Sequence, residues 1–187
     1  MDHIQNIQHI QHHEPCFWFA LFIKPHKERS TYELLQQKGY ETFLPFYLEK
    51  RKWANRQATR EKPVFPGYLF CRFNARWRMP ILTTPGVVNV LGFAGKPEPI
   101  DDGELLAIKK IAASPMGYNP CPYLEAGKRV RIIEGPLTGL KGILLERRQG
   151  RRLIVSVTLM QRSVAVELDH CAVDLIAAEK SDLKASA

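Results

Sequence analysis

The sequence lacks the patterns that mark several common classes of protein. No apolar run approaches the about twenty residues that a membrane-spanning helix needs. The first residues show no basic start followed by a hydrophobic stretch, so we expect neither a membrane span nor a signal peptide. The four cysteines are widely spaced and form no Cys-x-x-Cys pair, which argues against a zinc ribbon or a disulfide framework. A reducing, cytoplasmic setting fits best.

Motifs for catalysis and nucleotide binding are also missing. Gly135, Gly139 and Gly142 have no Gly-Lys-Ser or Gly-Lys-Thr ending and no helical pattern after them, so tight turns explain them better than a phosphate-binding loop. Histidine, cysteine and carboxylate residues do not cluster at a spacing that would build a nucleophile and its base. We therefore predict that the protein is not an enzyme and uses no cofactor.

What the chain does have is an excess of positive charge. Its 187 residues include 27 Lys and Arg against 19 Asp and Glu, a formal net charge of +8. Such a balance favours an acidic or polyanionic partner. The length and the 45% of hydrophobic residues suit one or two small globular domains.

The stretch 63–73, PVFPGYLFCRF, predicts a strand around which the first domain is organised. Period two puts Tyr68 and Phe70 on one face of this strand and Leu69 and Cys71 on the other. Both faces are largely apolar. Either both belong to ordinary core, or the face with Tyr68 and Phe70 is an exposed aromatic patch for a partner.

The surrounding pattern predicts an α+β fold in which an antiparallel sheet is flanked by helices and followed by a small β-barrel. The elements expected in the first part are strands over 17–23, 40–48 and 87–93, and helices over 26–38, within 75–84 and from 101. Short alternating strands are expected over 130–133, 142–147, 153–159 and 163–168. Closure into a barrel would protect the edges of such short strands.

These elements suggest five segments. We predict a disordered leader over 1–15, a first domain over 16–113, a linker over 114–123, a barrel over 124–177 and a tail over 178–187. The linker is expected from its prolines. The leader is rich in histidine, but no spacing in it fixes a coordination geometry, so disorder is preferred to a metal site.

Residues 50–62 carry six cations and one anion around Trp53, and they predict an exposed loop or a long hairpin. Cations beside an aromatic residue suit phosphate and base-stacking contacts. Arg51, Lys52, Trp53 and Arg56 are therefore candidate nucleic-acid contacts. A merely solvated surface hairpin is the equal alternative.

Two sets of motifs, in the same order, resemble one protein family. The segments 18–21 (WFAL), 65–70 (FPGYLF), 84–87 (TPGV) and 92–93 (GF) resemble the NGN domain of the NusG and RfaH transcription elongation factors. The segments 130–132, 135–142, 155–157 and 164–168 are similar to the KOW domain that follows it. The basic insertion and the proline-rich linker look most like specialised paralogues of the UpxY kind.

The resemblance implies that the first domain docks on the clamp helices of RNA polymerase, bridges the DNA cleft and suppresses pausing or termination. Matching motifs would place Phe22, Phe65, Tyr68 and Phe70 in the groove that holds those helices. The face with Tyr68 and Phe70 is also the one that the residue pattern offers to a partner.

Further contacts are implied in the same way. Trp77, Arg78 and Thr84 would make the cross-cleft contact, although the threonine-rich element of RfaH is not reproduced here. Lys24 and Lys38 would lie near the non-template DNA strand.

The resemblance also implies partners for the barrel. Met160 would contact a small-subunit ribosomal protein or a termination factor, or could equally be a core residue. Nascent RNA is another possible ligand, and a ribosome- or RNA-binding module acting in translation is the alternative function. A monomer is expected.

Overall fold

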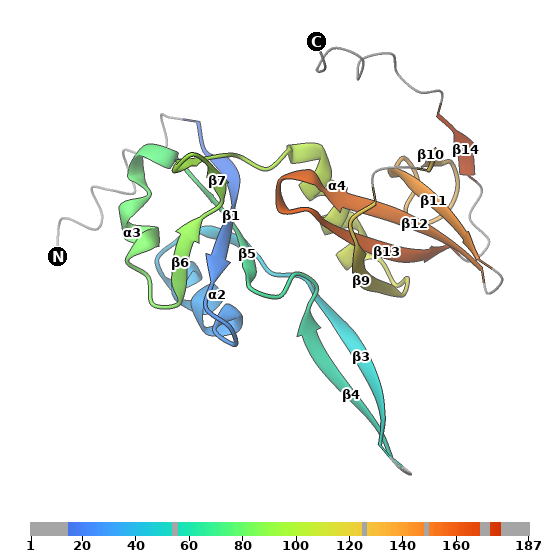
Figure 1. The fold of residues 1–187 in the computed structure, drawn as a ribbon, viewed down its shortest axis with the longest axis horizontal. Coiled ribbons are helices and arrows are strands. Elements are labelled where there is room, and N and C mark those ends of the chain that lie inside the picture. The colour runs from blue at the N-terminus through green and yellow to red at the C-terminus, as the bar shows by residue number, and fades with distance from the viewer. Residues whose placement is uncertain (1–14, 54–55, 125–126, 148–149, 169–172, 177–187) are drawn as a thin grey trace. The chain divides into compact units, whose positions relative to one another are not determined.

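The computed structural model describes residues 15–53, 56–124, 127–147, 150–168 and 173–176. These residues form an α+β fold with antiparallel sheets, as predicted (Figure 1). They divide into two compact units, one with the described residues up to Asp102 and Thr158–Met160, the other with Gly103–Val157 and the described residues from Gln161. The limits predicted for the domains, at 113 and 124, stay predictions.

The first unit is built on a four-stranded antiparallel sheet in the order β2-β5-β1-β6. Its strands are β1 (Phe17–Ile23), β2 (Glu41–Phe43), β5 (Tyr68–Phe73) and β6 (Val87–Val90). The stretch that organises the sequence therefore supplies one of the two central strands. Ala20 lies opposite Phe70 and Phe22 opposite Tyr68 in the β1–β5 ladder, which puts even-numbered residues of both strands on one face.

The odd-numbered face forms the hydrophobic core of this sheet. Leu69 and Cys71 belong to one buried cluster with Leu35 of α2 (Glu28–Gln37) and Ile81 of α3 (Met79–Leu82). Burial raises the pKa of the Cys71 thiol to about 12, and the negative charge of Glu41 adds to this effect. The thiol is therefore neutral at physiological pH and serves as a small apolar side chain.

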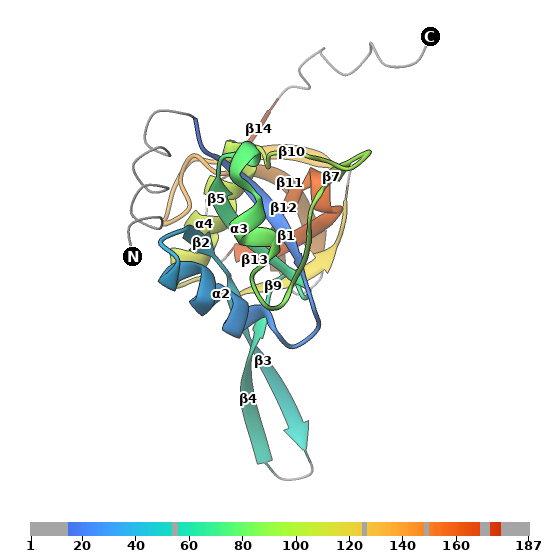
Figure 2. The same cartoon turned by 90° about the vertical axis from the view of Figure 1, so that its left-hand side faces the viewer.

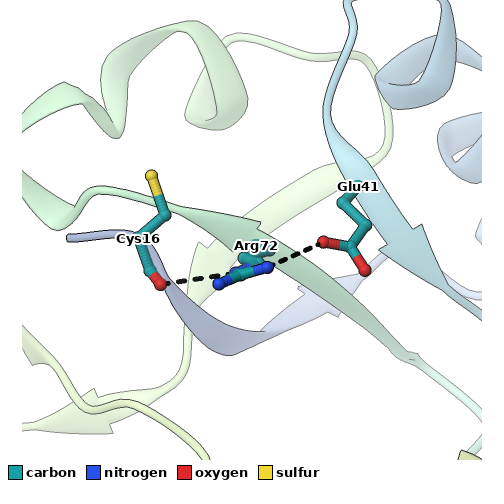
Figure 3. A network of polar contacts seen from close by, with 3 residues as sticks. All are labelled: Cys16, Glu41 and Arg72. Atoms are coloured by element: carbon teal, nitrogen blue, oxygen red, sulfur yellow. Dashed lines mark hydrogen bonds and ion pairs between the residues drawn. The ribbon is translucent and has the colours of Figure 1, made fainter. Parts of the chain in front are cut away.

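An exposed polar network joins β5 to β2 on the opposite face (Figure 3). Arg72 donates from Nε to the Cys16 carbonyl oxygen at 3.4 Å and from Nη1 to Glu41 Oε2 at 3.3 Å. Arg72 and Glu41 keep about half of their side-chain exposure. Such a pair adds about 0–1 kcal/mol to stability, so it orders the strand ends rather than holding the sheet together.

Two hairpins interrupt the expected pattern. The predicted strand over 40–48 is split at Pro45, after which β3 (Phe46–Trp53) pairs with β4 (Arg56–Pro63) as a separate two-stranded sheet. This confirms a long hairpin for the basic stretch. The predicted strand over 87–93 is also divided, because β6 ends at Val90 and β7 (Gly92–Phe93) pairs with β8 (Lys96–Pro97) in a two-stranded sheet of its own.

The second unit contains α4 (Asp102–Ala113) and a six-stranded antiparallel sheet in the order β14-β10-β11-β12-β13-β9. Its strands are β9 (Tyr118–Pro122), β10 (Lys128–Ile132), β11 (Lys141–Arg147), β12 (Gly150–Val157), β13 (Arg162–Leu168) and β14 (Val173–Leu175). Figure 2 shows the same elements after a quarter turn. This is the small C-terminal β-domain that the sequence predicted.

The strand β9 lies in a segment that its prolines suggested would be a linker. It pairs with β13 through the opposed residues Pro120 and Val164. The prolines are tolerated because β9 is at the end of the sheet order, where one side of a strand needs no ladder partner.

In the part of the chain that the structure describes, no helix is long and apolar enough to cross a membrane.

Candidate functional site

Two aromatic rings on the even-numbered face of the sheet reach the surface together. Phe22 of β1 and Tyr68 of β5 are ladder partners, and their ring centroids lie 5.7 Å apart at an interplanar angle of 59°. Phe22 is 43% exposed and Tyr68 is half-buried. We call Phe22 and Tyr68 the aromatic pair. It offers apolar area to a partner without leaving the core open.

The loop before Tyr68 is held against the aromatic pair. Gly67 has a φ of +80°, and a Cβ there would lie 3.6 Å from the Phe22 ring. The Gly67 amide donates to Glu28 Oε1 at 3.0 Å, and its carbonyl oxygen accepts from the Ile23 amide at 2.8 Å. A hydrogen bond from the first turn of α2 therefore holds the Pro66-Gly67 loop, which directly precedes Tyr68.

The other two predicted groove residues lie inside the protein. Phe65 is 2% exposed and Phe70 is 1% exposed. Their ring centroids lie 5.7 Å apart in an edge-to-face arrangement, and Phe43 stacks on Phe70 at 6.0 Å. The structure thus brings the four predicted residues together as two pairs, of which only Phe22 and Tyr68 can touch a partner in this conformation.

Sequence reasoning missed the neighbours of the aromatic pair on β6. Asn89 is the ladder partner of Phe22, and it is exposed. Val88 is also exposed, because the ladder shifts register between Phe22 and Ile23. A register shift leaves no mark in a hydrophobic alternation, so no signal in the sequence could have found these residues.

The three predicted cross-cleft residues do not share one environment. Trp77 is exposed in the short helix η1 (Ala75–Trp77), and Arg78 is half-buried after it. Thr84 is only 2% exposed, and its hydroxyl donates to the Pro80 carbonyl oxygen at 2.9 Å. Met79, which the sequence did not single out, is exposed beside Trp77. Trp77 and Met79 are therefore the side chains of this segment that a partner could touch, whereas Thr84 is buried and stabilises the turn after α3.

The two lysines predicted near DNA also differ. Lys24 has an exposed side chain, and its backbone amide donates to the Gly86 carbonyl oxygen at 2.9 Å. Lys38 donates from Nζ to the Pro80 carbonyl oxygen at 2.9 Å and to Thr84 Oγ1 at 2.7 Å. Its ammonium group ties the end of α2 to the turn after α3.

We expect Lys38→Gln to destabilise the fold by about 1 kcal/mol, because it removes two hydrogen bonds from a charged donor that remains partly solvated. Urea unfolding followed by circular dichroism measures this. Lys24→Gln is the matched control and should change stability by less than about 0.5 kcal/mol. Equal stability of the two variants would show that the Lys38 contacts do not support the turn.

The predicted nucleic-acid residues occupy the far half of the β3–β4 hairpin. In the ladder, Arg51 lies opposite Ala58, Lys52 opposite Gln57, and Trp53 opposite Arg56. Among these three partners only Arg56 is a cation, and it is itself one of the predicted residues. The structure therefore places all four predicted residues on neighbouring cross-strand positions.

Met160 ends the short helix η2 (Thr158–Met160) and is 5% exposed. This placement is what the core alternative requires, and a partner contact through Met160 would need its side chain to become accessible. Within the described residues, no group of three or more His, Cys, Asp or Glu is placed to hold a metal ion.

Comparison with known proteins places the chain among transcription factors. A family model described as "Transcription termination factor nusG" matches residues 17–109. The "Transcription termination/antitermination protein NusG" of Pseudomonas aeruginosa is 32% identical over 157 residues, covering 80% of this chain and 87% of that protein. The protein of the same description from Escherichia coli K12 is 33% identical over 124 residues, covering 61% and 66%.

A solved structure described as "Domain interaction in Thermotoga maritima NusG" matches with a TM-score of 0.48 and 20% identity, covering 81% of this chain and 93% of that chain. The family match spans all four strands of the first sheet and therefore includes the aromatic pair. The match to the Pseudomonas protein extends over most of both chains. The chain therefore belongs to the NusG family.

Proposed function

We propose that this protein is a transcription elongation and antitermination factor that binds RNA polymerase across the DNA cleft and suppresses pausing or termination. Membership in the NusG family supports the function, and the aromatic pair is the observation that supports the mechanism. The family consists of transcription factors rather than enzymes, in agreement with the prediction from the sequence.

The aromatic pair has the properties of an interface anchor. Binding energy in protein interfaces concentrates in a few aromatic residues that become fully desolvated. Phe22 keeps 43% of its surface exposed and therefore has area to bury against a partner. Phe65 and Phe70 are buried and packed edge to face, so the sheet that carries the aromatic pair is ordered before a partner binds. An amphipathic helix with apolar residues at its tip would fit this surface.

A second contact, on the other side of the DNA cleft, would allow the factor to hold the polymerase clamp closed. Trp77 and Met79 are exposed on a segment separate from the aromatic pair. If both surfaces are occupied only when the polymerase clamp is closed, the factor disfavours the open state. A hundredfold preference for the closed state corresponds to about 2.7 kcal/mol, enough to shift a balanced equilibrium almost completely.

Finer parts of the proposal rest on the resemblance. The second unit would contact a small-subunit ribosomal protein or a termination factor, and the first would follow the non-template DNA strand or nascent RNA. The protein would act as a monomer in the cytoplasm. Assignment to the specialised UpxY-like paralogues stays a prediction.

The proposal predicts that Phe22→Ala with Tyr68→Ala lowers capture of purified RNA polymerase by about thirtyfold or more, as expected for loss of a hot spot worth at least about 2 kcal/mol. Readthrough of pauses should fall in parallel, because the clamp would no longer be held. Affinity measured on immobilised elongation complexes and a single-round transcription assay provide the two readouts.

Phe17→Ala is the matched control, because Phe17 lies on the same strand and is 47% exposed. It should bind polymerase like the wild type. Unchanged capture and unchanged readthrough by the variant of the aromatic pair would refute the proposed mechanism, provided that its unfolding curve matches that of the wild type.

A further inference from the structure

The turn that leads into β5, over residues 65–68, has the features of a type II β-turn. The Tyr68 amide donates to the Phe65 carbonyl oxygen at 3.0 Å, which closes the turn. Pro66 occupies the second position, where its fixed φ is favourable, and Gly67 occupies the third with a φ of +80°. In the commoner type I turn the φ of the third residue is about −90°. The two forms are related by a flip of the peptide group between Pro66 and Gly67.

A side chain of α2 distinguishes between these two forms. The hydrogen bond of a β-turn joins its first and fourth residues, so the amide of the third residue is free to bind outside the turn. Here the Gly67 amide donates to Glu28 Oε1 at 3.0 Å. A flip of the peptide group would point the Gly67 N–H away from Glu28 and break this bond. Glu28 therefore stabilises the type II form selectively.

The aromatic pair contacts this turn on both sides. Tyr68 is the last residue of the turn, and the Gly67 backbone packs so closely on Phe22 that a Cβ at Gly67 would lie 3.6 Å from the Phe22 ring. Phe22 is 43% exposed and Tyr68 is half-buried, so burial alone does not fix either ring. The relative position of the two rings therefore depends on the form of the turn between them.

Glu28 is well placed to hold the turn. It is half-buried at the start of α2, a helix whose Thr31 and Leu35 are fully buried. A side chain on a packed helix is held more precisely than one on a loop. A carboxylate in the first turn of a helix also stabilises the helix itself through the helix dipole. An experiment must therefore separate the hydrogen bond to Gly67 from the charge of Glu28.

We propose that Glu28 is a positioning residue for polymerase binding, which locks the turn over 65–68 in its type II form and thereby presets the aromatic pair. The inference rests on the proposed function, in which the aromatic pair contacts RNA polymerase. The apparent affinity of a protein falls in proportion to the fraction of molecules in the competent form. Loss of the lock should therefore weaken binding without removing any side chain of the aromatic pair.

The test uses three variants of the full chain. Glu28→Ala removes the acceptor of the Gly67 amide, whereas Glu28→Gln keeps a side-chain oxygen at the same reach and removes only the charge. Glu41→Ala is the matched control, because it removes a carboxylate that binds Arg72 at the other end of β5 (Figure 3). Capture is measured on immobilised elongation complexes and corrected for the folded fraction from urea unfolding. Two-dimensional NMR of the ¹⁵N-labelled proteins measures solvent exchange of the Gly67 amide.

Glu28→Ala should weaken capture about tenfold, because loss of a hydrogen bond to a charged group is large enough to leave about one molecule in ten with the type II turn. The Gly67 amide should exchange with solvent about tenfold faster in the same variant. Glu28→Gln should bring both values to within about threefold of the wild type, since it restores the acceptor. Glu41→Ala should leave both values unchanged.

Three results would contradict the inference. Unchanged exchange of the Gly67 amide in Glu28→Ala would show that Glu28 does not hold the turn. Faster exchange with unchanged capture would show that the turn does not position the aromatic pair. Equal loss of capture in Glu28→Ala and Glu28→Gln, with the Gly67 amide still protected in Glu28→Gln, would show that the charge of Glu28 contacts polymerase directly.

These measurements also separate the inference from the proposed function. In each of the three contrary results the wild type still captures polymerase, so the proposed function stands. If the wild type captures no polymerase, the proposed function fails and the role of Glu28 in polymerase binding fails with it. The exchange of the Gly67 amide then still decides whether Glu28 locks the turn.

Discussion

Gly86→Ala should lower the free energy of unfolding by about 2–5 kcal/mol, from a strained backbone and a clash together. Gly86 has a φ of +98°, which side chains rarely allow, and a Cβ there would lie 2.1 Å from Thr31 Oγ1. Thr31 cannot move aside easily, because it is fully buried and its hydroxyl donates to the Pro85 carbonyl oxygen at 3.1 Å. Urea unfolding followed by circular dichroism measures the loss.

Gly95→Ala separates the two causes. Gly95 has a φ of +75°, but a Cβ there would meet no atom within 4 Å. This variant should show only the backbone cost, about 1–3 kcal/mol. The difference between the two variants then reports the clash with Thr31. If both variants lose the same stability, the packing of the turn against α2 does not determine the choice of glycine.

The same turn shows why some site residues could not be assigned from the sequence. Lys38 lies at the end of a helix and has the character of a surface cation, yet its ammonium group binds Thr84 and Pro80, more than forty positions away in the chain. Thr84, which accepts from that ammonium group, is only 2% exposed. A pattern based on spacing within a helix or strand contains no information about such distant partners.

The sheet shows how far alternation can predict burial. Period two correctly put Tyr68 and Phe70 on the face opposite Leu69 and Cys71, and Leu69 and Cys71 lie in the core cluster. It could not tell that Phe70 is buried while Tyr68 is half-exposed, because both follow the same alternation. Which part of a face is covered depends on neighbours such as Phe43, whose ring stacks on Phe70.

The exposure of the basic stretch was predictable for a different reason. Six cations in thirteen residues cannot be buried without partners, so residues 50–62 had to be exposed in some form. The ladder register was not predictable, because the stretch 50–62 contains no Asn-Gly or Asp-Gly pair that would set it. The cross-strand partners of Arg51, Lys52 and Trp53 emerge only from the three-dimensional structure.

Phe70→Ala should cost about 3–5 kcal/mol of stability, as is usual for removing a fully buried phenylalanine. The variant loses the ring contacts with Phe65 and Phe43 and leaves a cavity where the buried Phe70 ring was. We expect this variant to unfold at much lower urea concentration. Its capture of polymerase should fall only in proportion to the fraction of molecules that is unfolded.

Phe70→Leu provides the matched comparison, because it keeps most of the apolar volume and should recover much of the lost stability. If the ring acts only through packing, capture by this variant should return to the wild-type level once the protein is folded. If capture instead stays low in folded Phe70→Leu, the Phe70 ring contacts polymerase directly, and the sheet must open around it on binding. Since Phe22 and Tyr68 already offer surface without any such opening, we expect capture to return.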